Sequence, residues 1–136
     1  MSDLNHFGPF FKESEFKLED APEEYKQNTF LLVKLALNQI RKKFGKTIIT
    51  SGYRSPEYNE SLRARGYNPS KTSQHLTGSA VDFVCPNANM REVFEYVRGF
   101  WPGQVIYYSG KGHCHIGLPT LKLAREGRLY QWIKDE

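Results

Sequence analysis

Three of the four histidines in this 136-residue chain lie in two short stretches that could bind a metal ion. His75 and Asp82 stand seven positions apart in "SQHLTGSAVDF", and His113 and His115 flank a cysteine in the later "HCH". Side chains alternate between the two faces of a β-strand, so His113 and His115 are expected to point to the same side. If the two stretches are neighbouring strands, His75, Asp82 and one of the later histidines could converge on one ion.

Two imidazoles and one carboxylate form a ligand set that suits Zn²⁺. Three protein ligands leave the fourth position to water, which is the arrangement of a catalytic rather than a structural zinc site. The histidine that is not a ligand would then stand beside this water. On spacing alone, a simple loop around His75 and a hairpin whose histidines bond to the backbone explain the same pattern equally well.

These stretches, together with "SGYRS" at residues 51–55, resemble the zinc peptidases of the LAS group. Residues 73–82 read as S-x-H-x-x-G-x-A-x-D, and H-x-H follows at 113–115. The group includes D-alanyl-D-alanine carboxypeptidases, related phage endolysins and peptidoglycan endopeptidases, and the hedgehog signalling domain. The resemblance covers about residues 47–118, which we interpret as the motif-bearing core of one domain that spans 1–136.

The resemblance implies a role for each candidate residue. It implies that His75, Asp82 and His115 bind Zn²⁺, and that His113 acts on the water or on the transition state. It also implies that Arg54 contacts substrate. The forked donors of an arginine could bind a substrate carboxylate or the developing oxyanion, so we expect Arg54 to serve in both substrate binding and catalysis.

Three polar positions around the motifs allow a second interpretation. Outside its motif, Arg54 would be a surface arginine that pairs with Glu57. Ser73 and Gln74 are expected to orient the neighbouring histidine or to touch substrate, while an N-cap or turn role fits Ser73 as well.

The second motif raises two further questions about catalysis. Several members of the group carry a carboxylate three residues before the last histidine, where this chain has Gly112. His113 is then the nearby titratable group that the sequence offers as general base. Cys114 could be a nucleophile, but it points to the opposite strand face and is expected to be a buried, inert thiol.

The elements that must position these residues indicate an α+β fold with a small, mostly antiparallel sheet packed with helices. "KTIITS" at 46–51 predicts a short buried strand, residues 79–85 a second strand, and residues 104–118 a hairpin. The tail after Pro119 is expected to be a helical turn or coil. The helices are expected after Ser55, after Asn89, and along an apolar stripe that ends at Gly45; the stripe comprises Phe30, Val33, Leu37, Ile40 and Phe44.

Composition and charge restrict the setting. No apolar run is long enough to cross a bilayer, and the net charge of +4 comes without zinc-finger spacing or a helix-turn-helix signature, so we expect no nucleic acid partner. Two distant cysteines, Cys85 and Cys114, are expected to be thiols. The N-terminus shows no basic region followed by an apolar one, so we expect no secretory signal and synthesis in the cytoplasm.

The sequence therefore predicts a monomeric, zinc-dependent metallopeptidase that hydrolyses an amide bond in stem peptides or cross-bridges of bacterial peptidoglycan. Its type would be a D-Ala-D-Ala carboxypeptidase or an endopeptidase. The small size and the missing signal favour a phage or prophage lytic enzyme that acts on the cell wall after release, or a virion component. The alternative is a non-catalytic, zinc-bearing binding module of hedgehog type, and a more distant one is a structural protein that binds polyanions.

Overall fold

The computed structural model describes residues 7–67, 73–127, 129 and 131–135. It contains helices and one mixed sheet of five strands, in the order β1-β2-β4-β3-β5. Neighbouring strands are antiparallel except β3 and β5, which pair in parallel. The expected α+β fold with a mostly antiparallel sheet is confirmed; the strands are β1 (Ile48–Ser51), β2 (Ala80–Val84), β3 (Val105–Tyr108), β4 (His113–Gly117) and β5 (Gln131–Lys134).

Two expectations about strands were wrong. The strand at 48–51 is not buried, because β1 lies at the edge of the sheet and alternates between exposed and half-buried positions. The tail beyond Pro119 holds more than a helical turn, because its last residues form β5 beside β3. The four residues of β5, "QWIK", do not alternate between apolar and polar, so the sequence gives no sign of a half-buried strand there.

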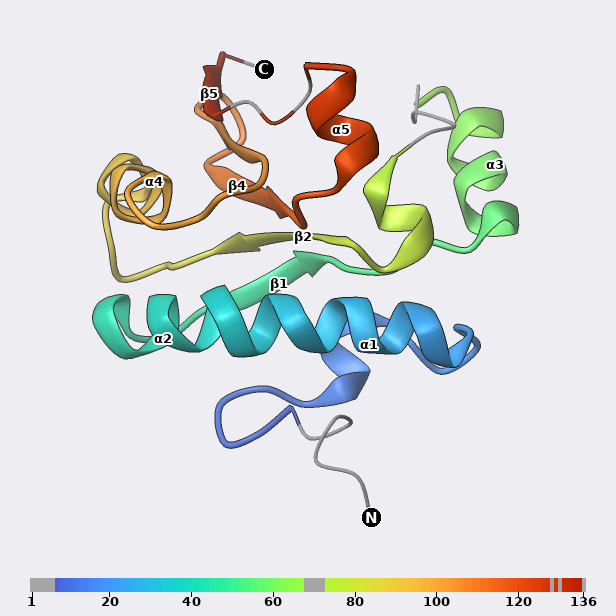
Figure 1. The fold of residues 1–136 in the computed structure, drawn as a ribbon, viewed down its shortest axis with the longest axis horizontal. Coiled ribbons are helices and arrows are strands. Elements are labelled where there is room, and N and C mark those ends of the chain that lie inside the picture. Colours follow the sequence, from blue (N-terminus) through green and yellow to red (C-terminus); the bar gives the residue numbers. More distant parts are fainter. Residues whose placement is uncertain (1–6, 68–72, 128, 130, 136) are drawn as a thin grey trace.

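The predicted apolar stripe forms one long helical segment, which runs below β1 and β2 in Figure 1. This segment passes through a π-helical turn, and Gly45 ends it with a positive φ of 80°. Ser55 and Asn89 cap the next two long helices, as predicted. The helices are α1 (Glu23–Leu32), η3 (Val33–Leu37), α2 (Asn38–Phe44), α3 (Pro56–Ala64), α4 (Met90–Arg98) and α5 (Leu121–Arg125), with 3₁₀ turns η2 (Glu13–Phe16) and η4 (Gln74–Thr77).

One face of the sheet packs against α1, α2 and α4 to form a continuous apolar core. Val81 and Phe83 of β2 and Cys114 and Ile116 of β4 all belong to this core and are fully buried. Because side chains alternate along a strand, the residues between them face the other side of the sheet. The core therefore dictates which polar residues of β2 and β4 are available for a site. No helix among the described residues is long and apolar enough to span a bilayer.

Candidate metal centre and cleft

Strand pairing places two of the candidate ligands side by side. Asp82 of β2 is the direct register partner of His115 of β4. His75 reaches the same point from η4, the 3₁₀ turn that leads into β2. One donor atom from each of the three residues lies within 4.8 Å of the other two, and all three residues are buried. The fold thus brings the expected trio together.

The contacts within this trio centre on one carboxylate oxygen. Oδ1 of Asp82 lies 2.9 Å from Nδ1 of His115 and 3.3 Å from Nε2 of His75. The two imidazole rings stand edge to face, with centroids 5.3 Å apart. Nδ1 of His115 and Nε2 of His75 are therefore the ring nitrogens that face the shared centre.

The outward nitrogen of each ring has its own partner. Nδ1 of His75 donates to the carbonyl oxygen of Gly52 at 2.8 Å. Nε2 of His115 lies 3.3 Å from Oε1 of Gln104, a residue with only 5% of its surface exposed. Because a carbonyl oxygen can only accept, each contact favours a ring proton on the outer nitrogen, so that the inner nitrogen could bind a metal ion in place of its contact with Asp82.

The protonation states also fit a metal centre. Burial raises the pKa of Asp82, but the adjacent imidazoles of His115 and His75 outweigh it and hold that pKa well below its usual range. Burial lowers the pKa of His115, and the nearby carboxylate offsets this only in part. An ionised carboxylate and a neutral imidazole are the forms that bind Zn²⁺. The two nitrogens and one oxygen therefore fit a zinc ion as a three-ligand set.

The trio lies in a cleft of about 530 Å³, which also contains His113, Arg54 and Ser73. His113 shares the strand face of His115, and its ring packs at a tilt against Tyr108 with the ring centroids 5.0 Å apart. Burial lowers the pKa of His113 as well. A neutral imidazole with a lone pair thus stands in the same cleft as the candidate ligands.

Arg54 enters the cleft from the turn between β1 and α3. Its backbone nitrogen donates to the carbonyl oxygen of His75 at 3.0 Å, and its Nη2 donates to Oγ of Ser51 at 3.4 Å. The first bond ties the backbone of the arginine to the backbone of a candidate ligand. Glu57, the alternative ion-pair partner, makes no salt bridge to Arg54 in the described structure.

A model of the family described as Peptidase M15 matches residues 11–117. The match covers well over half of the chain and contains every candidate site residue named above. The chain belongs to the Peptidase M15 family. Its resemblance to LAS-type zinc peptidases is thereby confirmed.

Relatives of this M15 domain include the proteins named peptidoglycan L,D-endopeptidase MepK of Escherichia coli K12 and of Shigella flexneri. Each is 34% identical over 68 residues, which make up 50% of this chain and 37% of the relative. The match thus covers little more than a third of the length of these relatives.

Two side chains near the candidate ligands of the M15 domain have structural partners. Oγ of Ser73 accepts from the backbone nitrogen of His75 at 3.1 Å, so Ser73 caps η4 while it also lines the cleft. Nε2 of Gln74 donates to the carbonyl oxygen of Leu118, and Gln74 is not among the residues that line the cleft. Its substrate contact stays a prediction, since the amide holds η4 against the end of β4.

The cysteine between the two histidines of the M15 domain is fully buried. Burial raises the pKa of Cys114 to about 12. Its thiol faces the apolar core, on the side of β4 opposite His113 and His115. A protonated thiol in the core cannot act as nucleophile in the cleft.

Sequence patterns did not reveal the outer partners of the two candidate histidine ligands. Gly52 contacts His75 through its backbone carbonyl oxygen, and a motif of side-chain types cannot predict a backbone contact. Gln104 precedes a strand of apolar residues, and a polar residue at such a buried position was the one available signal. Residues 68–72 of the expected loop before His75 lie outside the described residues.

Proposed function

We propose that this M15 domain is a zinc-dependent peptidase that hydrolyses an amide bond in the peptides of bacterial peptidoglycan. The observation that supports it most is the convergence of His75, Asp82 and His115 in a cleft that also holds His113 and Arg54. The names of the relatives, peptidoglycan L,D-endopeptidase, support the substrate class and favour an endopeptidase over a carboxypeptidase.

In this proposal His75, Asp82 and His115 hold Zn²⁺. Bound zinc acts as a Lewis acid and lowers the pKa of a bound water to about 7. The ring protons that His75 and His115 donate to Gly52 and Gln104 orient the imidazoles, and these hydrogen bonds raise the basicity of the rings as ligands.

The protein's own residues would supply proton transfer and charge stabilisation. His113, neutral because burial lowers its pKa, would accept a proton from the attacking water and return it to the departing amine. Arg54 would donate to the carbonyl oxygen as negative charge develops on it, or to a substrate carboxylate. The bond from its backbone to His75 keeps this donor in register with the candidate ligands.

The setting we propose is a phage or prophage lytic enzyme, made in the cytoplasm and active on the cell wall after release or as a virion component. It rests on the resemblance to the LAS group, which includes phage endolysins. We propose that the enzyme acts as a monomer.

A zinc-bearing binding module of hedgehog type is the second candidate, because Gly112 stands where several members of the group have a carboxylate. In the structure Gly112 has a φ of +74° and lies in the turn that enters β4. A side-chain base is thus missing at that position, and His113 would have to act as the general base without a carboxylate.

Mass spectrometry of fragments released from purified peptidoglycan by the zinc-loaded protein tests the proposal. We expect new fragments whose masses name the bond, and none from His115→Ala. His113→Ala should keep one zinc per chain and lose about 10²- to 10⁴-fold in turnover, the usual contribution of a general base. Intact peptidoglycan from a protein with one bound zinc would instead favour the binding module.

A further inference from the structure

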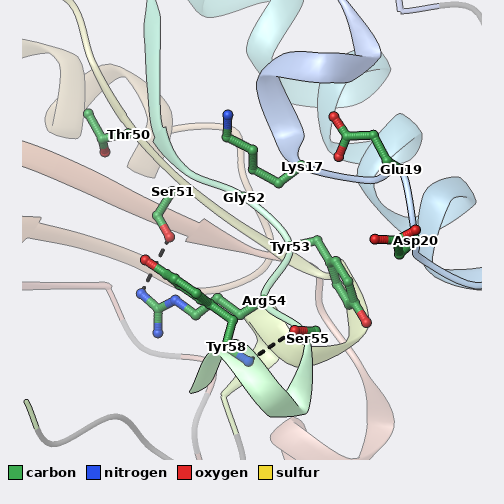
Figure 2. Close-up of a pocket in the computed structure, with 10 residues that line it drawn as sticks. All are labelled: Lys17, Glu19, Asp20, Thr50, Ser51, Gly52, Tyr53, Arg54, Ser55 and Tyr58. Carbon is green, nitrogen blue, oxygen red and sulfur yellow. Dashed lines mark hydrogen bonds between the residues drawn. The ribbon is translucent and has the colours of Figure 1, made fainter. Parts of the chain in front are cut away.

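A second pocket, of about 360 Å³, opens beside the cleft. The two share Thr50, Ser51, Arg54 and Tyr58 as lining residues, so Arg54 stands where one space passes into the other. Figure 2 shows Lys17, Glu19 and Asp20 on one side of this pocket, with Arg54 and Tyr58 across from them. A substrate that lies along the cleft would therefore extend past Arg54 into this pocket.

The turn that supplies the first three side chains is held firmly against the site. Phe16 and Leu18 are fully buried in the core, and the carbonyl oxygen of Phe16 accepts from the backbone nitrogen of Tyr53 at 2.9 Å. Lys17 has a φ of 59°, and among the described residues it is the only one other than glycine with a positive φ. The buried neighbours thus fix Lys17 in an uncommon backbone conformation that turns it outward.

The pocket carries two positive and two negative side chains, of which only Arg54 has a side-chain partner within the described structure. Lys17 and Arg54 are cationic, and Glu19 and Asp20 are anionic. Within the described part of the chain, Lys17, Glu19 and Asp20 form no ion pair or side-chain hydrogen bond. Two charges of each sign in one pocket are complementary to a ligand that carries both signs at separate points, rather than to an anion or a cation alone.

We propose that this pocket is a substrate subsite for an amino-acid unit that bears both a free ammonium and a carboxylate group. The inference rests on the proposed function, since diamino acids of peptidoglycan stem peptides present both groups. Glu19 and Asp20 bind the ammonium group, and Lys17 binds the carboxylate. Tyr53, whose ring lines the pocket next to Asp20 in Figure 2, forms an aromatic wall for the aliphatic stem.

Binding is tested on the zinc-loaded protein without turnover. The probe is a cross-linked stem-peptide dimer with one free side-chain amine, and its partner is the same dimer with that amine acetylated. In amide-resolved NMR titrations at low temperature on His113→Ala, the free-amine dimer should shift the signals of residues 17–20 at about tenfold lower concentration. Equal shifts from both dimers, or none at residues 17–20, would overturn the subsite.

Kinetics on the wild-type enzyme give a second, separate readout. The free amine should raise kcat/KM about tenfold over the acetylated dimer, and the double variant Glu19→Gln with Asp20→Asn should abolish this preference. Glu24→Gln, an exposed acid in the first turn of α1, should keep the preference. Lys17→Met should lose the preference for a free over an amidated carboxyl group.

The outcomes separate the two proposals. Cleavage of both dimers at equal rates, or a preference that survives the double variant, refutes the subsite and leaves the peptidase intact. No cleavage by the zinc-loaded wild type, combined with the expected shifts at residues 17–20, refutes the peptidase for these dimers and retains the subsite as a binding feature.

Discussion

Replacing Gly52 by alanine should disturb both the stability of the fold and the geometry of the metal centre. A Cβ at this position would lie 2.5 Å from the carbonyl oxygen of Phe16 and within 2.9 Å of two further backbone atoms of that residue. Backbone atoms cannot rotate away as a flexible side chain can. The methyl group therefore has to push the 16–20 turn and residues 52–53 apart.

The magnitude follows from the contacts that would move. Overpacking of this kind costs about 1–3 kcal/mol, and weakening the bond from the Tyr53 nitrogen to the Phe16 oxygen adds about 1 kcal/mol. We expect a loss of about 2–4 kcal/mol in the free energy of unfolding. Because the Gly52 carbonyl orients His75, zinc affinity should fall about 10- to 100-fold, as is usual for an outer partner of a ligand.

Urea denaturation of the metal-free protein measures the stability, and competition with a chromophoric chelator measures zinc affinity. Gly99→Ala is the matched control, since a Cβ there comes no closer than 3.3 Å to another atom and Gly99 lies at the far end of α4. It should change stability by less than about 1 kcal/mol and leave zinc affinity as it was. A Gly52→Ala protein that behaves like this control would refute the proposed link between the turn and His75.

Three further outcomes can be checked on the same protein. Gln104→Leu should weaken zinc binding about tenfold while Gln104→Glu retains it, because only the carboxylate can still accept from Nε2 of His115; chelator competition measures both. Cys114 should resist a thiol reagent at pH 8 in the folded protein and react in denaturant, since its pKa is raised to about 12; rapid labelling of the native Cys114 would contradict its burial. Asn89→Ala should cost about 1 kcal/mol of stability through its lost bonds to the nitrogens of Arg91 and Glu92, with zinc affinity unchanged.

The parts of the fold that sequence predicted well are those whose signals are local. The caps at Ser55 and Asn89 and the turn before β4 each depend on a few adjacent residues, and the structure confirms all three elements. Strand alternation in "HCH" likewise predicted that Cys114 is buried and that His113 shares the cleft with His115. A period of two needs no knowledge of distant residues.

What sequence could not supply depends on contacts between distant segments. The position of β1 at an edge and the parallel pairing of β5 are properties of the sheet order, which no local pattern encodes. The Gly52 carbonyl meets His75 across 23 residues, and Gln104 meets His115 across 11. The charged pocket is also non-local, because it joins Lys17 to Arg54, two residues on separate elements.

The sheet order places two candidate metal ligands and the proposed substrate contacts in parts of the fold that differ in local stability. Asp82 and His115 sit on the inner strands β2 and β4, where each strand has a neighbour on both sides, whereas Arg54, Ser73 and the 17–20 turn belong to connections at the periphery. Inner strands open only with global unfolding, and peripheral connections open at lower free energy. Amide hydrogen exchange should therefore be slower in β2 and β4 than in these connections. In a peptidase of the proposed kind, mutations that change which peptide binds could then accumulate in these connections while Asp82 and His115 stay in place.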